Sequence, residues 1–378
     1  MESRCTLVDK KNSLKLIKQI DWKLVLIVTV IFLYGLIVLS SATLTEKTGN
    51  YGQIYRQLLA FVLGTSLICV ILIFDYNFLG KYYKELYIVS LILLAAVLIP
   101  GIGVVRGGAR SWINLGVLNF QTSELVKLTF ILSYAKIVES KKGKLNTLKE
   151  IIPVLVYAAP FIGLLFAQPD LGTAIVFMCI VFGMLFTAGL STKIIKQAFI
   201  VLFVSLPIIY MLMAPHQKVR IEAFLNPEDI TLEGNYQVLQ SIIAIGSGGI
   251  FGKGLHNGSQ TQDNFLPVQD SDFIFAVVGE ELGLIGMTAF LILFVLFLIR
   301  LIYIAKEAKD FYGTLIVVGV TSMFTYQIVQ NIGMTVVLIP VTGVTLPFVS
   351  YGGSSLLTSL ANLGLVLNVY MRKKKINF

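Results

Sequence analysis

Long apolar runs recur along almost the whole chain, with short polar stretches between them. A helix needs roughly 20 mostly apolar residues to cross a bilayer. Runs of about this length predict membrane-spanning helices at 24–41, 56–75, 86–101, 123–139, 151–167, 171–190, 194–213, 273–300, 312–337 and 346–371. The pattern therefore predicts an all-α polytopic membrane protein with about ten transmembrane helices, in preference to a soluble protein made of buried helices.

Composition supports this interpretation. The 378 residues are 56% hydrophobic and only 13% charged, and the mean hydropathy is +0.83. A soluble domain carries about twice that fraction of charged residues. We therefore treat residues 1–378 as a single transmembrane domain.

The basic residues predict the orientation, because Lys and Arg are in excess in cytoplasmic loops. With the N-terminus inside, the cytoplasmic segments hold 22 of the 30 basic residues and the outward segments hold 7. The tails 1–22 and 372–378 are then both cytoplasmic. The net charge of +9 follows from this topology and gives no indication of nucleic acid binding.

Two long outward loops are expected, at 102–122 and at 214–272, and the second connects the seventh and eighth helices. In the second loop, Tyr236, Leu239, Ile242 and Ile243 share one helical face. This pattern is typical of a short helix lying on the membrane surface.

Residues 338–354 are irregular although they lie between two apolar runs, since they contain two prolines, three glycines and several hydroxyl groups. Backbone without helical hydrogen bonds is tolerated at membrane depth only where protein surrounds it or where it lines a wet cavity. We expect a cavity open to the outer side here.

Ionisable residues in or beside spans are costly and are therefore candidate functional residues. Glu124 and Lys127 are spaced i, i+3 near the outer end of the fourth span. They could form a structural ion pair, or they could line the cavity, where Lys127 would face an anionic head group. Asp170 could be a helix N-cap or a substrate contact.

The outer start of the eighth span is rich in carboxylates. Asp272 could cap this helix or act on a substrate, and Asp270, Glu280 and Glu281 are close in sequence. Asp272 and Glu280 are about 12 Å apart along a helix, so they do not form an obvious catalytic pair.

Several other features have simple explanations. The segment SGGIFGKG lacks the first Gly and the final Ser or Thr of a phosphate-binding loop, so we reject nucleotide binding, although Lys253 could still face a lipid phosphate. His216 and His256 have no metal-ligand spacing around them. Trp112 is most simply an interfacial anchor. Up to this point an enzyme and a transporter for an anionic lipid-linked substrate both fit.

Six stretches of the chain resemble the SEDS family (shape, elongation, division and sporulation). They are GARSWINLG (108–116), FQTSELVKL (120–128), QPDLGTA (168–174), YQVLQSIIAIGSGGIFGKGL (236–255), FLPVQDSDFIFAVVGEELG (265–283) and NIGMTVVLIPVTGVTLPFVSYGGSS (331–355). NIGMT and GSQTQDNFLP are most similar to the elongation branch, RodA. Two positions depart from the family pattern. Thr122 replaces a usual Pro, and Asp270 replaces a usual His or Lys, which places a second carboxylate beside Asp272.

The resemblance implies a peptidoglycan glycosyltransferase of the bacterial cytoplasmic membrane that polymerises lipid II on the outer face during elongation. Asp272 would be the catalytic base, with Arg110, Lys127, Arg220 and Lys253 as candidates to hold the pyrophosphate. Trp112, Glu124, Asp170 and Glu280 complete the expected substrate-binding set. A divalent cation, magnesium or manganese, could assist, although no ligand cluster in the sequence requires one.

The family also implies partners, namely undecaprenyl-linked glycan, a class B penicillin-binding protein that crosslinks the product, and membrane proteins of the elongation machinery. Two alternatives stay open: a lipid II flippase without chemistry, and a division or sporulation member of the family. Irregular and charged segments collect on the outer side, which favours chemistry there over transport.

Overall fold

The computed structural model describes residues 19–43, 51–106, 108–114, 119–145, 147–213, 215–229, 231–232 and 234–373. Most of the predicted tail 1–22, the end of the tail 372–378 and small parts of both outward segments lie outside these ranges.

The described chain is mainly helical. Its longer helices are α2 (Trp22–Thr43), α3 (Gly52–Ile73), α5 (Tyr83–Ala96), α6 (Thr122–Glu139), α7 (Leu148–Ala167), α8 (Leu171–Thr187), α9 (Thr192–Leu212), α10 (Pro215–Leu225), α11 (Asn235–Gly248), α13 (Ile274–Glu307), α14 (Phe311–Thr335) and α15 (Gly353–Met371). The short helices are α4 (Tyr76–Lys81) and α12 (Ser259–Gln262). Three strands, β1 (Gly103–Arg106), β2 (Ala109–Asn114) and β3 (Asn119–Gln121), form an antiparallel sheet in the order β1-β2-β3.

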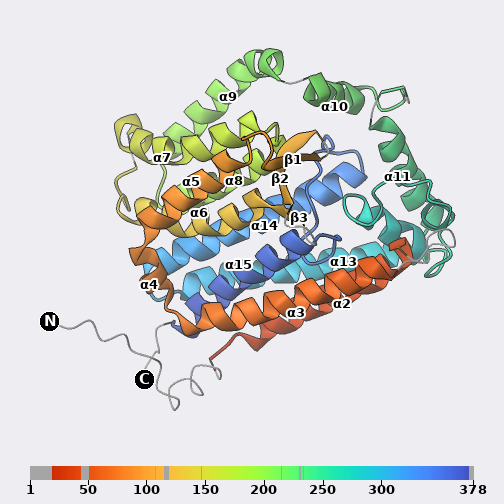
Figure 1. Cartoon of the computed structure of the whole chain (residues 1–378), viewed down its shortest axis with the longest axis horizontal. Helices are drawn as coiled ribbons and strands as arrows, with labels where there is room; N and C mark the ends of the chain where they lie inside the picture. Colours follow the sequence, from red (N-terminus) through yellow and green to blue (C-terminus); the bar gives the residue numbers. More distant parts are fainter. Residues whose placement is uncertain are drawn as a thin grey trace.

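The long helices run alongside one another as a bundle (Figure 1). Helix α15 packs against α3 and α14, and α14 also packs against α8 and α13. Nearly all side chains of α15 are buried, whereas α3 presents many large apolar side chains outward. Such an outward apolar surface is stable in lipid, so the chain is a multi-pass membrane protein.

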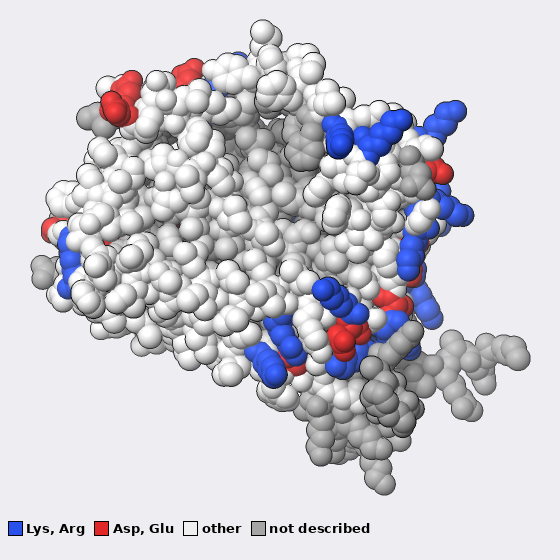
Figure 2. Space-filling view, turned by 180° about the vertical axis from the view of Figure 1, so that it is seen from behind, with Lys and Arg blue, Asp and Glu red and all other residues white. Residues whose placement is uncertain are grey.

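Ion pairs gather at one end of the bundle. Arg300 Nε lies 2.7 Å from Asp21 Oδ2, Arg372 Nε lies 3.3 Å from Asp75 Oδ2, and Lys373 Nζ lies 3.4 Å from Glu307 Oε2. Figure 2 shows charged side chains at the edges of a broad uncharged band. In the predicted topology this ion-paired end is cytoplasmic, and the sheet, α10 and α11 lie at the opposite, outer end (Figure 1).

Most of the predicted spans coincide with helices, but some boundaries were wrong. The third span was expected to continue to residue 101, yet α5 ends at Ala96 and turns follow. The tenth was expected from residue 346, yet α15 begins at Gly353, because residues 347–351 form turns and bends. Within the described residues, six helices are long and apolar enough to span a bilayer, so the number of ten stays a prediction.

The expectation of an all-α protein was also wrong in detail. The outward segment 102–122 contains the β1-β2-β3 sheet instead of irregular loop. Val104 pairs with Trp112, and Ile113 pairs with Phe120. Strand pairing satisfies the backbone of a segment that glycines keep from forming a helix.

The predicted surface helix is α11. Tyr236, Ile242 and Ile243 are exposed on it, as a membrane-facing side would be, while Val238, Ser241 and Ala244 are buried. The buried side packs against α13. Helix α11, which is part of the long outward segment, therefore lies directly against α13, the helix that follows Asp272.

Candidate functional site

Asp272 lies in a short loop immediately before α13, and three hydrogen bonds hold this loop. Tyr351 N donates to Asp270 O at 2.9 Å. Ser350 Oγ donates to Ser271 O at 2.6 Å, and Asn331 Nδ2 donates to Asp272 O at 3.0 Å. The position of Asp272 is therefore set by the end of α14 and by the chain leading into α15.

Residues 338–352 have no regular secondary structure, and side chains from neighbouring helices satisfy their backbone. Gln330 Nε2 donates to Pro340 O at 2.8 Å, and Asn331 Nδ2 donates to Val344 O at 2.9 Å. Gln57, on α3, donates to Ser350 O at 3.0 Å and accepts from Gly352 N at 3.3 Å. These bonds supply what non-helical backbone requires inside a membrane protein.

Phe348 anchors the same segment. Its ring is buried against Phe297 and Phe324, with ring centroids 5.5 and 5.4 Å away. Its backbone has φ = 66°, a left-handed conformation that costs a non-glycine residue roughly 1–2 kcal/mol. Two aromatic contacts are worth about 0.5–1.5 kcal/mol each, which is enough to hold this conformation.

The environment of Asp272 favours the protonated carboxyl group. Burial raises the pKa of Asp272 to about 6, and the negative charge of Asp270 adds to this effect. The guanidinium of Arg220 acts in the opposite direction. Burial also raises the pKa of Asp270, whose carboxyl group accepts a hydrogen bond from Gln53. Asp272 is therefore an acid whose pKa lies close to neutral pH.

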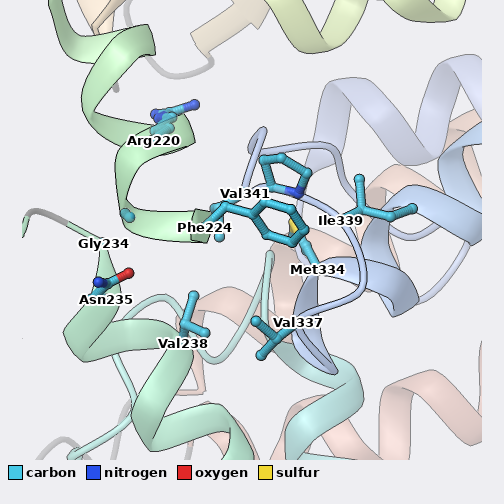
Figure 3. Close-up of a pocket in the computed structure, with 11 residues that line it drawn as sticks. Arg220, Phe224, Gly234, Asn235, Val238, Met334, Val337, Ile339 and Val341 are labelled. Carbon is cyan, nitrogen blue, oxygen red and sulfur yellow. The ribbon is translucent and has the colours of Figure 1, made fainter. Parts of the chain in front are cut away.

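Arg220 reaches this region from α10. It lines a pocket of about 330 Å³, including the part open to the surroundings, with Phe224 on the same helix. Figure 3 shows Val337, Ile339 and Val341 across from them, in the chain that follows α14, and Asn235 and Val238 below on α11. A pocket therefore lies beside the irregular segment, and its opening to the outer side stays a prediction.

Glu124, Lys127 and Asp170 form a second group. Lys127 Nζ lies 2.6 Å from Glu124 Oε1, and both side chains are almost completely buried. Asp170 is the N-cap of α8, since its Oδ1 accepts from Thr173 N at 3.1 Å. Burial raises the pKa of Asp170, while hydrogen bonds from Thr173 and the charge of Lys127 oppose this. The structural expectations for these residues, an ion pair and a helix cap, are both confirmed.

Asp272 and the group of Glu124, Lys127 and Asp170 both lie near the irregular segment 338–352. A Cβ on Gly172 would lie 2.9 Å from Thr342 O, and a Cβ on Gly343 would lie 3.6 Å from Asp272 Oδ2. The missing side chain of Gly172 lets the start of α8 approach Thr342 closely, while Gly343 has φ = 69°, a left-handed conformation that favours glycine. Asp170 and Asp272 therefore lie on either side of residues 342–343.

Lys253 and Glu280 are engaged with each other. Lys253 Nζ lies 2.8 Å from Glu280 Oε1, and the same carboxylate accepts from the backbone N of Gln260 and Thr261 at 2.9 and 3.0 Å. This pair holds the loop around α12. Lys253 thus already has a carboxylate partner, and its expected contact with a lipid pyrophosphate stays a prediction.

The remaining predicted residues lie on β2. Arg110 N donates to Gln168 O at 3.1 Å, and Arg110 Nη1 donates to Leu98 O at 3.5 Å. Trp112 is partly buried in the sheet. Among the described residues, no group of three or more His, Cys, Asp or Glu side chains could hold a metal ion.

Sequence reasoning missed the polar residues that position Asp272. Gln57, Asn331 and Ser350 are nearly completely buried among apolar neighbours. A buried amide in a membrane span is itself a signal, because it must find a partner there. Gln57 and Asn331 could have been selected on that basis.

One family model and several known proteins match this chain over nearly its whole length. The family model FTSW_RODA_SPOVE, described as "Cell cycle protein", matches residues 21–375. Stage V sporulation protein E of Bacillus subtilis is 40% identical, over 92% of this chain and 96% of its own length. Peptidoglycan glycosyltransferase MrdB of Escherichia coli is 34% identical, over 92% of this chain and 94% of its own length.

Two solved structures are similar along almost the whole chain. One is described under "Structural coordination of polymerization and crosslinking by a peptidoglycan synthase complex"; its TM-score is 0.81 at 35% identity, and the match covers 94% of this chain and 98% of that one. The other is the rod shape determining protein RodA of Thermus thermophilus, with a TM-score of 0.71 at 32% identity and coverage of 94% and 98%.

The raised pKa of Asp272 leads to a prediction about stability. In an unfolded chain the pKa of Asp is about 3.9, so the folded protein binds this proton more tightly. The stability that this proton provides is present below pH of about 4, is lost as the pH rises, and is fully lost above pH of about 6. Asp272→Asn should therefore raise the stability at pH 8 by about 2–3 kcal/mol, and the gain should disappear below pH of roughly 4. The measurement is the thermal unfolding midpoint in detergent as a function of pH.

Asp229→Asn is the matched control, because Asp229 is exposed and hydrogen bonds from Thr231 lower its pKa. This variant should not be more stable than the wild type. An unfolding midpoint for Asp272→Asn equal to that of the wild type at every pH would show that the carboxyl group is not held in a destabilising environment.

Proposed function

The chain belongs to the FtsW/RodA/SpoVE family of cell cycle proteins, and on this premise we propose that it is a glycosyltransferase that polymerises lipid II into peptidoglycan strands on the outer face of the cytoplasmic membrane. One observation above all supports this proposal. Asp272, at the predicted outer end of the bundle, is held by a hydrogen bond from Asn331, has a pKa of about 6 and is influenced by the charge of Arg220. The named relatives include peptidoglycan glycosyltransferases of this length.

In the proposed reaction Asp272 is the general base. Its carboxylate removes the proton from the 4-hydroxyl of lipid II as that oxygen attacks the anomeric carbon of the lipid-linked glycan. The bond from this carbon to undecaprenyl pyrophosphate breaks with inversion, by analogy with inverting glycosidases. A base with a pKa near the working pH is ionised and still accepts a proton effectively, which agrees with a pKa of about 6 for Asp272.

Arg220 is proposed to hold the departing pyrophosphate. A guanidinium offers paired donors to phosphate oxygens, and Arg220 lines a pocket against residues 337–341 from where its charge influences Asp272. Lys127 is paired with Glu124, and Lys253 with Glu280, so both have their charge already matched. We assign these two lysines, with Glu124, Glu280 and Asp170, to holding the site's framework.

A crosslinking partner is part of the proposal. One similar solved structure is described as a peptidoglycan synthase complex for polymerization and crosslinking, which supports a class B penicillin-binding protein as partner. A role in elongation is the finer proposal. NIGMT at 331–335 supports it, while the 40% identity to a sporulation protein favours a sporulation role instead.

The proposal predicts that Asp272→Ala abolishes polymerisation. Loss of a general base lowers the rate by about 10²–10⁴-fold, and the variant should still accumulate in the membrane. The measurement is glycan chain formation from labelled lipid II by purified protein with its partner.

Wild-type kcat/KM should fall below pH of about 6, because protonated Asp272 cannot accept the proton.

Neighbouring charges should move this pH dependence. Asp270→Asn removes a negative charge and should shift the decline to lower pH, while Asp229→Asn should not shift it. Wild-type polymerisation by Asp272→Ala would rule out the assigned base. Transport of lipid II without any glycan product would indicate a flippase.

Arg220 and Lys253 should respond differently to replacement. Arg220→Gln should lower kcat/KM about a hundredfold, since a lost oxyanion contact costs about 2–4 kcal/mol. Arg220→Lys should not restore it, because an ammonium does not reproduce a bidentate contact. Lys253→Gln should instead lower thermal stability, because Glu280 would lose its buried partner.

The measurement is the polymerisation rate in detergent at two ionic strengths, normalised to folded protein. A fewfold loss for Arg220→Gln that vanishes with added salt would mean that Arg220 only attracts anionic head groups.

A further inference from the structure

Helix α13 is broken near the end that follows Asp272. Gly283 has φ = 64° and ψ = −163°, a backbone conformation that is not helical and is open mainly to glycine. The break separates a short helical segment, 274–282, from the long remainder of α13. An unbroken helix would fix the direction of the chain before it, whereas the short segment must be oriented by contacts of its own. The position of Asp272 therefore depends on what holds this segment and the loop before it.

The chain after α11 runs beside the break and pairs with it. Leu284 N donates to Gly249 O at 3.0 Å, and Gly254 N donates to Glu281 O at 2.9 Å. A side chain at Gly252 would collide with Glu281 O, so the two stretches of backbone approach closely only because glycine is present there. The loop 249–262 and the short segment of α13 are thus connected to each other.

Helix α2 contacts α13 on both sides of the break. Ser41 Oγ donates to Glu281 Oε1 at 2.5 Å, and Tyr34 Oη donates to Gly286 O at 3.1 Å. Gln262 Nε2, on α12, donates to Ser41 Oγ at 3.1 Å. The side chains of Ser41 and Glu281 are almost completely buried, so water does not compete for this bond. The end of α2 therefore supports both α12 and the short segment of α13.

Gln269 connects α2 to the loop that carries Asp272. Its Nε2 donates to Ala42 O, at the end of α2, at 2.9 Å and to Thr261 O, on α12, at 3.1 Å. A longer contact of 3.4 Å joins the same nitrogen to Asn264 Oδ1. Gln269 is buried and lies three residues before Asp272. One amide therefore ties this loop to two helices at once.

The backbone between Gln269 and Asp272 is a closed turn. Ser271 N and Phe273 N both donate to Val268 O, at 3.2 and 3.3 Å. Phe273 is fully buried and is the N-cap residue of α13. The chain between Gln269 and Asp272 therefore has little freedom, and a contact that fixes Gln269 also restrains Asp272.

We propose that Gln269 is a positioning residue, through which the end of α2 sets the place of the proposed base Asp272. The inference rests on the proposed function, since it concerns the base of that reaction. Asn331 and Ser350 hold the loop from α14 and from the segment 338–352, and Gln269 holds it from α2. Gln269 acts through Asp272, by keeping its carboxylate at the distance and angle that proton removal needs.

Gln269→Met tests this role, because methionine is similar in length and flexibility but donates no hydrogen bond. Gln262→Met is the matched control, since Gln262 also donates to the end of α2 but lies ten residues before Asp272. The assay is glycan synthesis from labelled lipid II by the full chain with its partner, normalised to folded protein. Gln269→Asn is a milder second variant, whose shorter amide weakens both contacts.

Gln269→Met should lower kcat by about tenfold to a hundredfold, because a base displaced by about 1 Å loses that much rate. Its KM should stay within about twofold of the wild type, since the substrate's own contacts are unchanged. Gln269→Asn should lower kcat by about threefold, and Gln262→Met should keep kcat within about twofold. A wild-type kcat in Gln269→Met, an equal loss in Gln262→Met, or a rise in KM alone would overturn the proposal.

A second readout separates this inference from the proposed function. Amide hydrogen exchange of the full chain in nanodiscs reports how firmly residues 265–273 are held, without any need for activity. Exchange there should be faster in Gln269→Met than in the wild type and in Gln262→Met. A wild-type protein that makes no glycan would reject the polymerase function. The exchange comparison would then still decide the role of Gln269, because exchange in Gln269→Met equal to that of the wild type would reject it.

Discussion

Backbone that leaves its helical conformation inside a membrane protein must find hydrogen-bond partners within the protein, and residues 338–352 are where this constraint acts. Gln330 and Asn331 at the end of α14 and Gln57 on α3 supply most of the partners. Within the segment itself, Ser350 Oγ accepts a hydrogen bond from Leu346 N. Helices α3, α14 and α15 are therefore connected through one irregular stretch of chain.

The same bonds determine the chemistry of the site. Asn331 donates to Val344 O and also to Asp272 O, so one amide fixes both the segment and the proposed base. Enclosure by the segment removes water from Asp272, which raises its pKa to about 6. Asp272 is destabilising when ionised, and Phe348 holds a costly backbone conformation. Strain and buried charge of this kind are typical of functional sites.

Part of this arrangement could be predicted from the sequence. Apolar runs located the long helices, since length and hydropathy suffice for that. The i, i+3 spacing predicted the Glu124–Lys127 pair, and a short polar residue before an apolar run predicted the cap at Asp170. Interactions over long sequence separations could not be predicted, such as the hydrogen bond of Gln57 with Ser350 or the effect of the Arg220 charge on Asp272. The β1-β2-β3 sheet was missed because its strands are short and interrupted by turns.

The central claim is that the polar contacts of the irregular segment hold the base in the buried position where burial raises its pKa. Asn331→Leu tests it most directly, because leucine is similar in size and cannot donate a hydrogen bond. In protein that is folded and present in the membrane, kcat for glycan synthesis should fall about tenfold or more, and the low-pH decline of kcat/KM should move to lower pH, because a displaced Asp272 regains water and its pKa falls. A wild-type rate with an unmoved pH profile would contradict the account.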